Sequence, residues 1–262
     1  MPEIIAGLFG LLIGSFLNVC IYRWPRDLSV VAPRSRCPGC ERTIAWYDNI
    51  PVLSYVLLWG RCRHCSQRIS ARYPLVEALT AAAFICAVAQ HGLTLEAAKY
   101  CVLAAIVIAL IFSDLDTRIL PDELTIGGCI IGIAFSFFVA IPDSTFAILA
   151  SLAGFTLNAR ASSAGESLLG ALVPAFGLWL IGWLFEKLRH KEGLGFGDVK
   201  MIAAIGAFLG IRGTLFSLVV GSVLGSVTGL IWIAVTRKDA GTYQLPLGTF
   251  LGIGALAATY WT

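Results

Sequence analysis

Charged side chains are scarce in this sequence. Asp, Glu, Lys and Arg make up 13% of its 262 residues, against about a quarter in soluble globular domains. Hydrophobic residues make up 58%, and the mean hydropathy is +0.82. This balance excludes an ordinary water-soluble domain and indicates a chain that lies in a lipid bilayer.

No internal repeat or low-complexity tract is present. Instead, apolar segments long enough to cross about 30 Å of hydrocarbon recur along the chain. We therefore predict an all-α polytopic membrane protein with about eight transmembrane helices. The segments are 3–21, 74–90, 97–113, 124–141, 167–185, 199–211 with its flanks, 213–235 and 245–261.

The first apolar segment lacks the marks of a secretory signal peptide. No Lys or Arg precedes it, and no small-residue cleavage site follows it, so we expect residues 1–22 to be a retained transmembrane helix. Lys and Arg collect in cytoplasmic loops. With a periplasmic N-terminus, sixteen of the nineteen basic residues lie inside and only Lys99, Arg160 and Arg212 lie outside. The net charge of +3 thus reflects topology, and no nucleic-acid partner is expected.

Residues 23–73 differ from the rest of the chain. They hold nine Arg and four of the eight Cys, and we predict a cytoplasmic insert between the first and second transmembrane helices. About fifty residues are few for a self-sufficient hydrophobic core, so support from a metal or the membrane is expected. The predicted domains are therefore residues 1–22, the insert, and a membrane-embedded core over 74–262.

The insert carries two CxxC knuckles, Cys37 with Cys40 and Cys62 with Cys65, separated by twenty-one residues. This spacing predicts four thiolate ligands for Zn²⁺ in a zinc-ribbon-like module. Two disulfides are the alternative, but disulfides rarely persist in the reducing cytoplasm. Four cysteine ligands leave no open position for water, so the metal is expected to be structural.

A polar stretch separates the fourth and fifth apolar segments. Residues 143–166 are predicted to form an external loop, with an interfacial helix as one variant. A ninth transmembrane helix or a re-entrant segment is the alternative.

Two carboxylates stand at the ends of apolar segments on the same predicted membrane face. Asp114 follows the third segment without a break, and Asp198 opens the sixth. Ionisable groups in such places are costly to desolvate and point to function when two of them can meet. The simpler interpretation of Asp198 is a helix N-cap. Three further acids in the first loop are interpreted as solvated charges: Asp116, Asp122 and Glu123.

Two Asp close enough to share a proton can divide the work of catalysis. One acts as base toward water, and the other acts as acid toward the peptide carbonyl and the leaving amine, which is aspartyl protease chemistry. Gly195 and Gly197 allow backbone conformations closed to other residues and a close approach of an unwound substrate. We expect these glycines and Lys200 to position the substrate.

Several motifs together resemble the long, bifunctional form of the type IV prepilin peptidases. They are Asp114 seven residues before Pro121-Asp122, 195–200 (GFGDVK) continued by 203–210, 14–19 followed by Tyr22-Arg23, the two knuckles around 46–51, and 69–77. The resemblance covers nearly the whole chain, in order. Only 143–166 is longer and more polar than the family pattern.

The resemblance implies that Asp114 and Asp198 are catalytic. It implies an enzyme of the bacterial inner membrane that cuts type IV prepilins or pseudopilins, for pilus assembly or type II secretion. Cleavage follows the Gly that ends a basic leader, on the cytoplasmic side. The bifunctional form then methylates the new N-terminus from S-adenosylmethionine. The insert has no GxGxxG fingerprint of a Rossmann-type domain, so no residue is assigned to the methyl donor.

Two alternative functions share parts of this pattern. A GxGD-type intramembrane protease without methyltransferase activity has the Asp pair but not the zinc insert. A non-enzymatic membrane assembly factor would use its acidic residues only as helix caps. Glu77 lies a turn inside the second apolar segment, where its charge needs a partner, and an Arg of the insert is a candidate.

Overall fold

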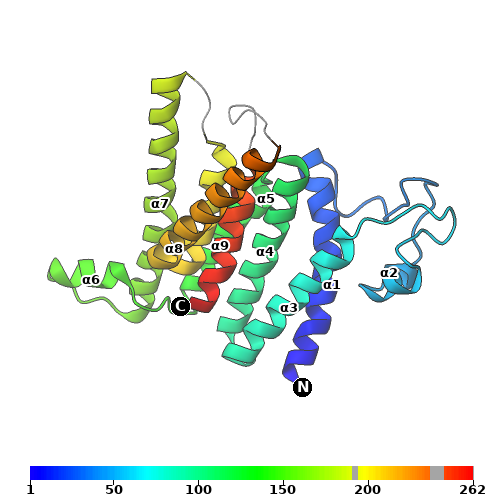
Figure 1. The fold of residues 1–262 in the computed structure, drawn as a ribbon. Helices are drawn as coiled ribbons and strands as arrows, with labels where there is room; N and C mark the ends of the chain where they lie inside the picture. Colours follow the sequence, from blue (N-terminus) through cyan, green and yellow to red (C-terminus); the bar gives the residue numbers. More distant parts are fainter. Residues whose placement is uncertain (191–193, 237–244, 262) are drawn as a thin grey trace. The chain divides into compact units, whose positions relative to one another are not determined.

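The computed structural model describes residues 1–190, 194–236 and 245–261, and the regular elements in these residues are helices (Figure 1). Its only strand-like pairings are the isolated bridges Arg36–Thr43 and Arg61–Arg68. The predicted all-α class is confirmed. The α-helices are α1 (Pro2–Arg23), α2 (Leu53–Leu57), α3 (Arg72–His91), α4 (Leu95–Thr117), α5 (Asp122–Ser136), α6 (Thr145–Leu152), α7 (Ala159–Arg189), α8 (Phe196–Thr236) and α9 (Leu247–Trp261).

Five of the described helices are long and apolar enough to cross a membrane, namely α1, α3, α4, α7 and α8. Helix α9 is apolar but shorter. Helix α8 is interrupted at Gly210, whose φ of 69° is not helical. It therefore consists of two consecutive helices joined by a kink at this residue. The break falls at the predicted boundary between the sixth and seventh segments. The count of eight transmembrane helices stays a prediction.

The chain divides into two compact units, Met1–Phe112 and Ser113–Thr262. In the first, α1 and α3 pack closely through glycines of α1. A methyl group on Gly10 would lie 2.7 Å from the Cα of Ala81, and one on Gly14 would lie 2.6 Å from the Cα of Glu77. Small residues let membrane helices approach in this way. The division at residues 22 and 73 predicted from sequence is not tested by these units.

In the second unit, the first half of α8 is the central element. Met201, Ile202 and Phe208 are fully buried. Gly170 of α7 lies directly against α8, because a methyl group there would come within 2.6 Å of the Gly206 carbonyl oxygen. Helices α5 and α9 also pack against α8. This arrangement fixes the start of α8, which carries Asp198.

The predicted loop over 143–166 is wrong in its second part. Residues from Ala159 onward belong to α7, which begins two turns earlier than the apolar segment, with the Asn158 side chain accepting a hydrogen bond from the Ala161 N–H (2.8 Å). The first part holds the short helix α6. Its 8 residues extend about 12 Å at a rise of about 1.5 Å per residue. A ninth transmembrane helix is therefore excluded at α6.

Glu166, near the start of α7, is buried and accepts three hydrogen bonds. One carboxyl oxygen accepts the Phe146 N–H (2.8 Å) and the Ser144 hydroxyl (3.3 Å), and the other accepts the Ile211 N–H (3.0 Å). Ile211 directly follows the break at Gly210. The carboxyl group thus joins the start of α6 to the interruption of α8, a role that composition alone does not reveal.

Candidate active site and cysteine cluster

Asp114 lies in the last turns of α4 and is only 5% exposed. The helix ends just after it, where Arg118 takes a φ of 60° and donates its N–H to the Asp114 carbonyl oxygen (3.0 Å). The Asp114 side chain is fixed by Thr249. Its Oδ2 accepts both the N–H (2.7 Å) and the hydroxyl (2.8 Å) of that residue, which lies in the first turn of α9. The N-terminus of α9 therefore holds the carboxyl group in place.

Asp198 is the third residue of α8 and is half-buried. Its N–H donates to the Gly195 carbonyl oxygen (3.1 Å), which closes the turn that opens the helix. Asp198 lies inside the first helical turn, so the N-cap interpretation is wrong by position. Its side chain is free to face the end of α4.

The two carboxyl groups flank Gly248. A methyl group built on this glycine would lie 3.2 Å from Oδ1 of Asp198 and 3.3 Å from Cγ of Asp114. Both groups are therefore in contact range of one point on the backbone of α9. Two carboxyl groups that flank one backbone position repel each other when both are ionised, so this arrangement favours one ionised and one protonated group.

The two glycines before Asp198, Gly195 and Gly197, leave room for neighbouring side chains, and neither has a positive φ. Among described glycines, positive φ occurs only at Gly60, Gly92, Gly154 and Gly210. A methyl group on Gly195 would lie 3.3 Å from Oδ2 of Asp198, and one on Gly197 would lie 3.2 Å from Leu120. The conformational reason given from sequence for Gly195 and Gly197 is thus wrong, whereas the close approach of a substrate to these glycines stays a prediction.

Lys200 forms an ion pair with Asp122, at the start of α5. Asp122 is therefore more than a solvated loop charge. Asp116 and Glu123 are exposed, as expected from sequence. A role of Lys200 toward substrate stays a prediction.

The sequence reasoning missed Gly248 and Thr249. Neither is ionisable, and both open an apolar segment that carries no other sign of chemistry. Only their contacts with Asp114 and Asp198 single them out.

The four predicted cysteines of the insert come together. The sulfur atoms of Cys37, Cys40, Cys62 and Cys65 all lie within 4.8 Å of one another, with 3.7 Å between those of Cys37 and Cys65. All four are free thiols, so the disulfide alternative is not supported. A tetrahedral zinc site with Zn–S bonds of about 2.3 Å needs sulfurs about 3.8 Å apart. The donor set therefore fits a metal ion.

The two knuckles are built alike. The first cysteine of each donates its N–H to a carbonyl oxygen five residues later, from Cys37 to Arg42 (3.0 Å) and from Cys62 to Gln67 (2.9 Å). In the second knuckle, the N–H groups of Cys65 and His64 lower the pKa of the Cys62 thiol to about 6. The hydrogen bond from the Gln67 N–H lowers the pKa of the neighbouring Cys65 thiol, but desolvation and the nearby cysteine thiols raise it to about 11. Cys62 is therefore the first of the two to form the thiolate that binds metal.

A bidentate ion pair ties the segment between the knuckles to the second knuckle. Arg63 donates from Nε (3.0 Å) and from a terminal nitrogen (2.6 Å) to the Asp48 carboxylate. The guanidinium group holds the pKa of Asp48 below its usual value. The pair contributes to the order of the insert beside the cysteine cluster.

Glu77 has a different partner from the one expected. Its Oε2 accepts the backbone N–H of Val52 (2.7 Å), just before α2, in place of an Arg side chain. The prediction that this buried carboxyl group is joined to the insert holds, but the partner was wrong. A backbone donor can satisfy a carboxylate without bringing a second charge into the apolar region.

Apolar helices of membrane-spanning length and two carboxyl groups set against one backbone define a membrane-embedded protein with a paired-aspartate site. The profile described as "Bacterial Peptidase A24 N-terminal domain" matches residues 8–91, and the one described as "Type IV leader peptidase family" matches residues 101–230. The chain belongs to the type IV leader peptidase family. No solved structure matches it.

Curated relatives agree over most of the chain. A prepilin leader peptidase/N-methyltransferase of Myxococcus xanthus is 39% identical over 87% of this chain, and the chain spans 62% of that relative's length. The Aeromonas hydrophila enzyme of the same name is 36% identical, with 97% of this chain and 89% of the relative covered. A type 4 prepilin-like proteins leader peptide-processing enzyme of Escherichia coli O78:H11 is 36% identical, with 99% and 94% covered. The predicted family and the predicted class, a peptidase with methyltransferase activity, are confirmed.

Proposed function

We propose that Asp114 and Asp198 are the catalytic pair with which this enzyme removes the basic leader of type IV prepilins or pseudopilins. The observation that carries the proposal is the position of both carboxyl groups against Gly248. The family supports leader cleavage, and the relatives' names extend it to prepilins.

The pair has one proton to share. The ionised carboxylate takes a proton from a water molecule as the water oxygen bonds to the peptide carbonyl carbon. The protonated carboxyl group gives its proton to the carbonyl oxygen. When the tetrahedral intermediate collapses, the C–N bond breaks and the leaving amine receives the proton taken from water. The hydroxyl group formed from the carbonyl oxygen returns its proton to the carboxylate that donated it, so the C=O bond re-forms and the pair again holds one proton. The pair is then ready for another cycle.

The peptide bond must reach the carboxyl groups as extended chain. The backbone at Gly195 and Gly197 is bare and lies directly before Asp198, so it can run beside an unwound segment of the substrate. Lys200, which forms an ion pair with Asp122, lies two residues after Asp198 on α8. We assign these three residues to substrate positioning.

The site is proposed to face the cytoplasm. Eight membrane spans, a periplasmic N-terminus and the insert between the first two spans put most Lys and Arg inside, as the positive-inside rule requires. The membrane would be the inner membrane of a bacterium. The basic residues of the last predicted inner loop, Arg237 and Lys238, lie outside the described residues.

The insert is proposed to hold one Zn²⁺ through Cys37, Cys40, Cys62 and Cys65. Bound there, the metal supplies folding energy to a segment with little core of its own. The insert is also proposed to serve N-methylation from S-adenosylmethionine, the activity in the names of the relatives. No described residue is assigned to the methyl donor.

Mass spectrometry of a processed prepilin tests the function. The purified chain is incubated with prepilin and S-adenosylmethionine, beside Asp114→Asn, Asp198→Asn and the exposed-residue control Asp116→Asn. We expect cleavage after Gly and a mass gain of one methyl group, with cleavage lost only in the first two variants. Cleavage without methylation would favour the GxGD-type protease, and full activity of Asp114→Asn and Asp198→Asn would refute the catalytic pair.

A further inference from the structure

The insert exposes a run of large apolar side chains between its two knuckles. Each is at least 39% exposed, and Trp59 reaches 89%. We call this surface the apolar foot. It consists of Trp46, Tyr47, Ile50, Leu53, Val56, Leu57 and Trp59. A water-soluble module rarely leaves such a run exposed, so something apolar is expected to cover it.

The hydrogen bond from Val52 to Glu77 fixes the depth at which α2, the helix that carries Leu53, Val56 and Leu57, begins. Glu77 packs against Gly14, since a methyl group on Gly14 would lie 2.6 Å from the Glu77 Cα. Gly14 precedes Arg23 by nine positions in α1, which is about 13 Å at a rise of about 1.5 Å per residue. Helix α2 therefore starts level with the middle of α1, as Figure 1 also shows.

At that level α1 exposes apolar side chains, which are expected to face lipid. Its apolar stretch is about as long as the hydrocarbon layer is thick, and Leu12 (59%) and Phe16 (48%) are exposed on it. The apolar foot thus continues a surface that already belongs in the bilayer. Because the apolar foot and this part of α1 lie at the same depth and are both apolar, we expect lipid to cover the foot.

A second part of the insert lies at the end of α1 and offers a comparison. Val31 is as exposed as Trp59, at 89%. The Arg23 guanidinium donates to the carbonyl oxygens of Ser29 (2.7 Å) and Pro33 (2.6 Å), so the turn over 29–33 is held level with Arg23. Val31 and Trp59 are equally exposed but lie at different depths along α1. A label that comes from lipid should therefore reach Trp59 more than Val31, whereas a label that depends on exposure alone should reach both equally.

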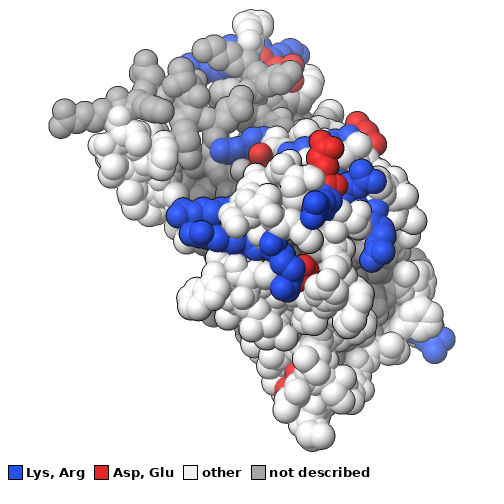
Figure 2. Space-filling view, turned by 90° about the vertical axis from the view of Figure 1, so that its right-hand side faces the viewer, with Lys and Arg blue, Asp and Glu red and all other residues white. Residues whose placement is uncertain are grey.

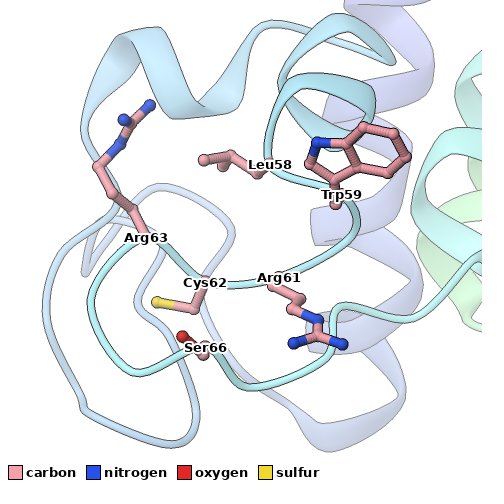
Figure 3. Close-up of a pocket in the computed structure, with 6 residues that line it drawn as sticks. All are labelled: Leu58, Trp59, Arg61, Cys62, Arg63 and Ser66. Atoms are coloured by element: carbon pink, nitrogen blue, oxygen red, sulfur yellow. The ribbon is translucent and has the colours of Figure 1, made fainter.

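Basic side chains lie near the apolar foot, as expected for a surface that meets lipid headgroups. Figure 2 shows Lys and Arg side chains in a broad band across the face that carries the insert. Beside the foot lies a hollow of about 580 Å³ (Figure 3), with Leu58 and Trp59 on one side and Arg61 and Ser66 on the other. Apolar and cationic walls together suit an acyl chain and its anionic headgroup.

We propose that the apolar foot is buried in the leaflet of the bilayer next to the insert, with Arg61 at the level of anionic lipid headgroups. The insert is then a membrane-anchored module. The hydrogen bond from Val52 to Glu77 joins it to α3, and lipid contacts its apolar foot. Buried apolar side chains with flanking Arg are the features of an interfacial membrane anchor.

Photolabelling of the full chain in phosphatidylcholine nanodiscs tests the anchor. A phosphatidylcholine with a diazirine in its acyl chain is included, and labelled peptides are quantified by mass spectrometry. We expect several-fold more label on 53–59 than on 29–33, with the peptide holding Leu12 and Phe16 as positive control. Equal labelling, or label on the control peptide alone, would overturn the proposal.

Two matched variants refine the test. Trp59→Glu should reduce the label on 53–58 several-fold, whereas Val31→Glu should leave it unchanged, with zinc content measured to establish that the insert remains folded. Adding anionic phosphatidylglycerol should raise the label in wild type but not in Arg61→Gln, and no rise in wild type would refute the headgroup contact. Crosslinks between copies of 53–59, with loss of lipid label in nanodiscs holding two chains, would identify a second copy as occupant instead.

Discussion

The backbone N–H and the hydroxyl group of Thr249 donate hydrogen bonds to the same oxygen of Asp114. Helix α9 therefore contributes to the site with uncharged groups, the N–H and hydroxyl of Thr249 and the backbone of Gly248. Its first turn holds one carboxyl group by hydrogen bonds and leaves room for both carboxyl groups at Gly248. The site is built by α4, α8 and α9 together.

Replacing Thr249 by Val removes the hydroxyl bond to Asp114 but keeps the backbone N–H and the shape of the side chain. Because a hydrogen bond to a charged group contributes about 1.5–3 kcal/mol, we expect kcat of prepilin cleavage to fall about tenfold or more, with little change in KM. Thr259→Val, which removes a hydroxyl bond to Leu256 in the same helix, is the control. A Thr249→Val enzyme of normal kcat would show that the backbone bond alone positions Asp114.

Gly248→Ala should damage cleavage by displacing the carboxyl groups. The new methyl group would sit 3.2 Å from Asp198 and 3.3 Å from Asp114, tighter than usual carbon contacts. Methylation of a pilin that has already been cleaved should persist. Gly127→Ala, where a methyl group meets nothing within 4 Å, should leave both activities intact. Equal activity of the two variants in a peptidase assay would contradict the proposed geometry.

Removal of zinc should unfold the insert and leave the membrane helices in place. Metal analysis is expected to give about one Zn²⁺ per chain in wild type and a much lower content in Cys37→Ser. Hydrogen exchange over 36–68 should become fast after chelation, while α7 and α8 stay protected. Cys129→Ser serves as control, because Cys129 lies in α5, outside the cluster. Unchanged exchange over 36–68 would mean that the metal is not structural.

Glu166→Gln should lower stability, because one of its oxygens becomes an NH₂ group that cannot accept the N–H of Phe146 or of Ile211. Leaving a buried donor without an acceptor costs about 1–3 kcal/mol. Thermal unfolding in detergent should show a lower Tm than wild type. Glu186→Gln, an exposed position near the other end of α7, should not. A Tm equal to that of wild type would show that the carboxyl group is replaceable.

The Asp48–Arg63 pair predicts a pH dependence of the insert. Arg63 depresses the pKa of Asp48 in the folded state. The ionised pair therefore stabilises the folded insert fully above the usual pKa of 3.8, and this stabilisation is lost as the pH falls from 3.8 through the depressed pKa. Asp48→Asn should therefore exchange faster over 46–63 than wild type, by the same margin at pH 7 and at pH 5. Glu41→Gln, an exposed acid of the first knuckle, is the control. A margin that closes between these two pH values would contradict the sign of the shift.

The sequence by itself determined the membrane class, the cysteine cluster and the two aspartates. Each rests on a local pattern, since length and polarity define an apolar segment and spacing defines a CxxC knuckle. Asp114 and Asp198 were found because an ionisable group beside an apolar segment is costly without a purpose. Family membership followed from the same motifs.

Only the tertiary structure decided which uncharged groups complete the site and which carboxyl groups are structural. Gly248 and Thr249 lie far from Asp114 in the chain, and nothing in their own neighbourhood marks them. Glu166 was assigned to a loop because its donors, at Phe146 and Ile211, come from separate helices. Backbone N–H groups are present at nearly every position, so which of them meets a carboxylate depends on packing between distant segments. The depth at which α2 begins is decided in the same way, by one bond from Val52 to Glu77.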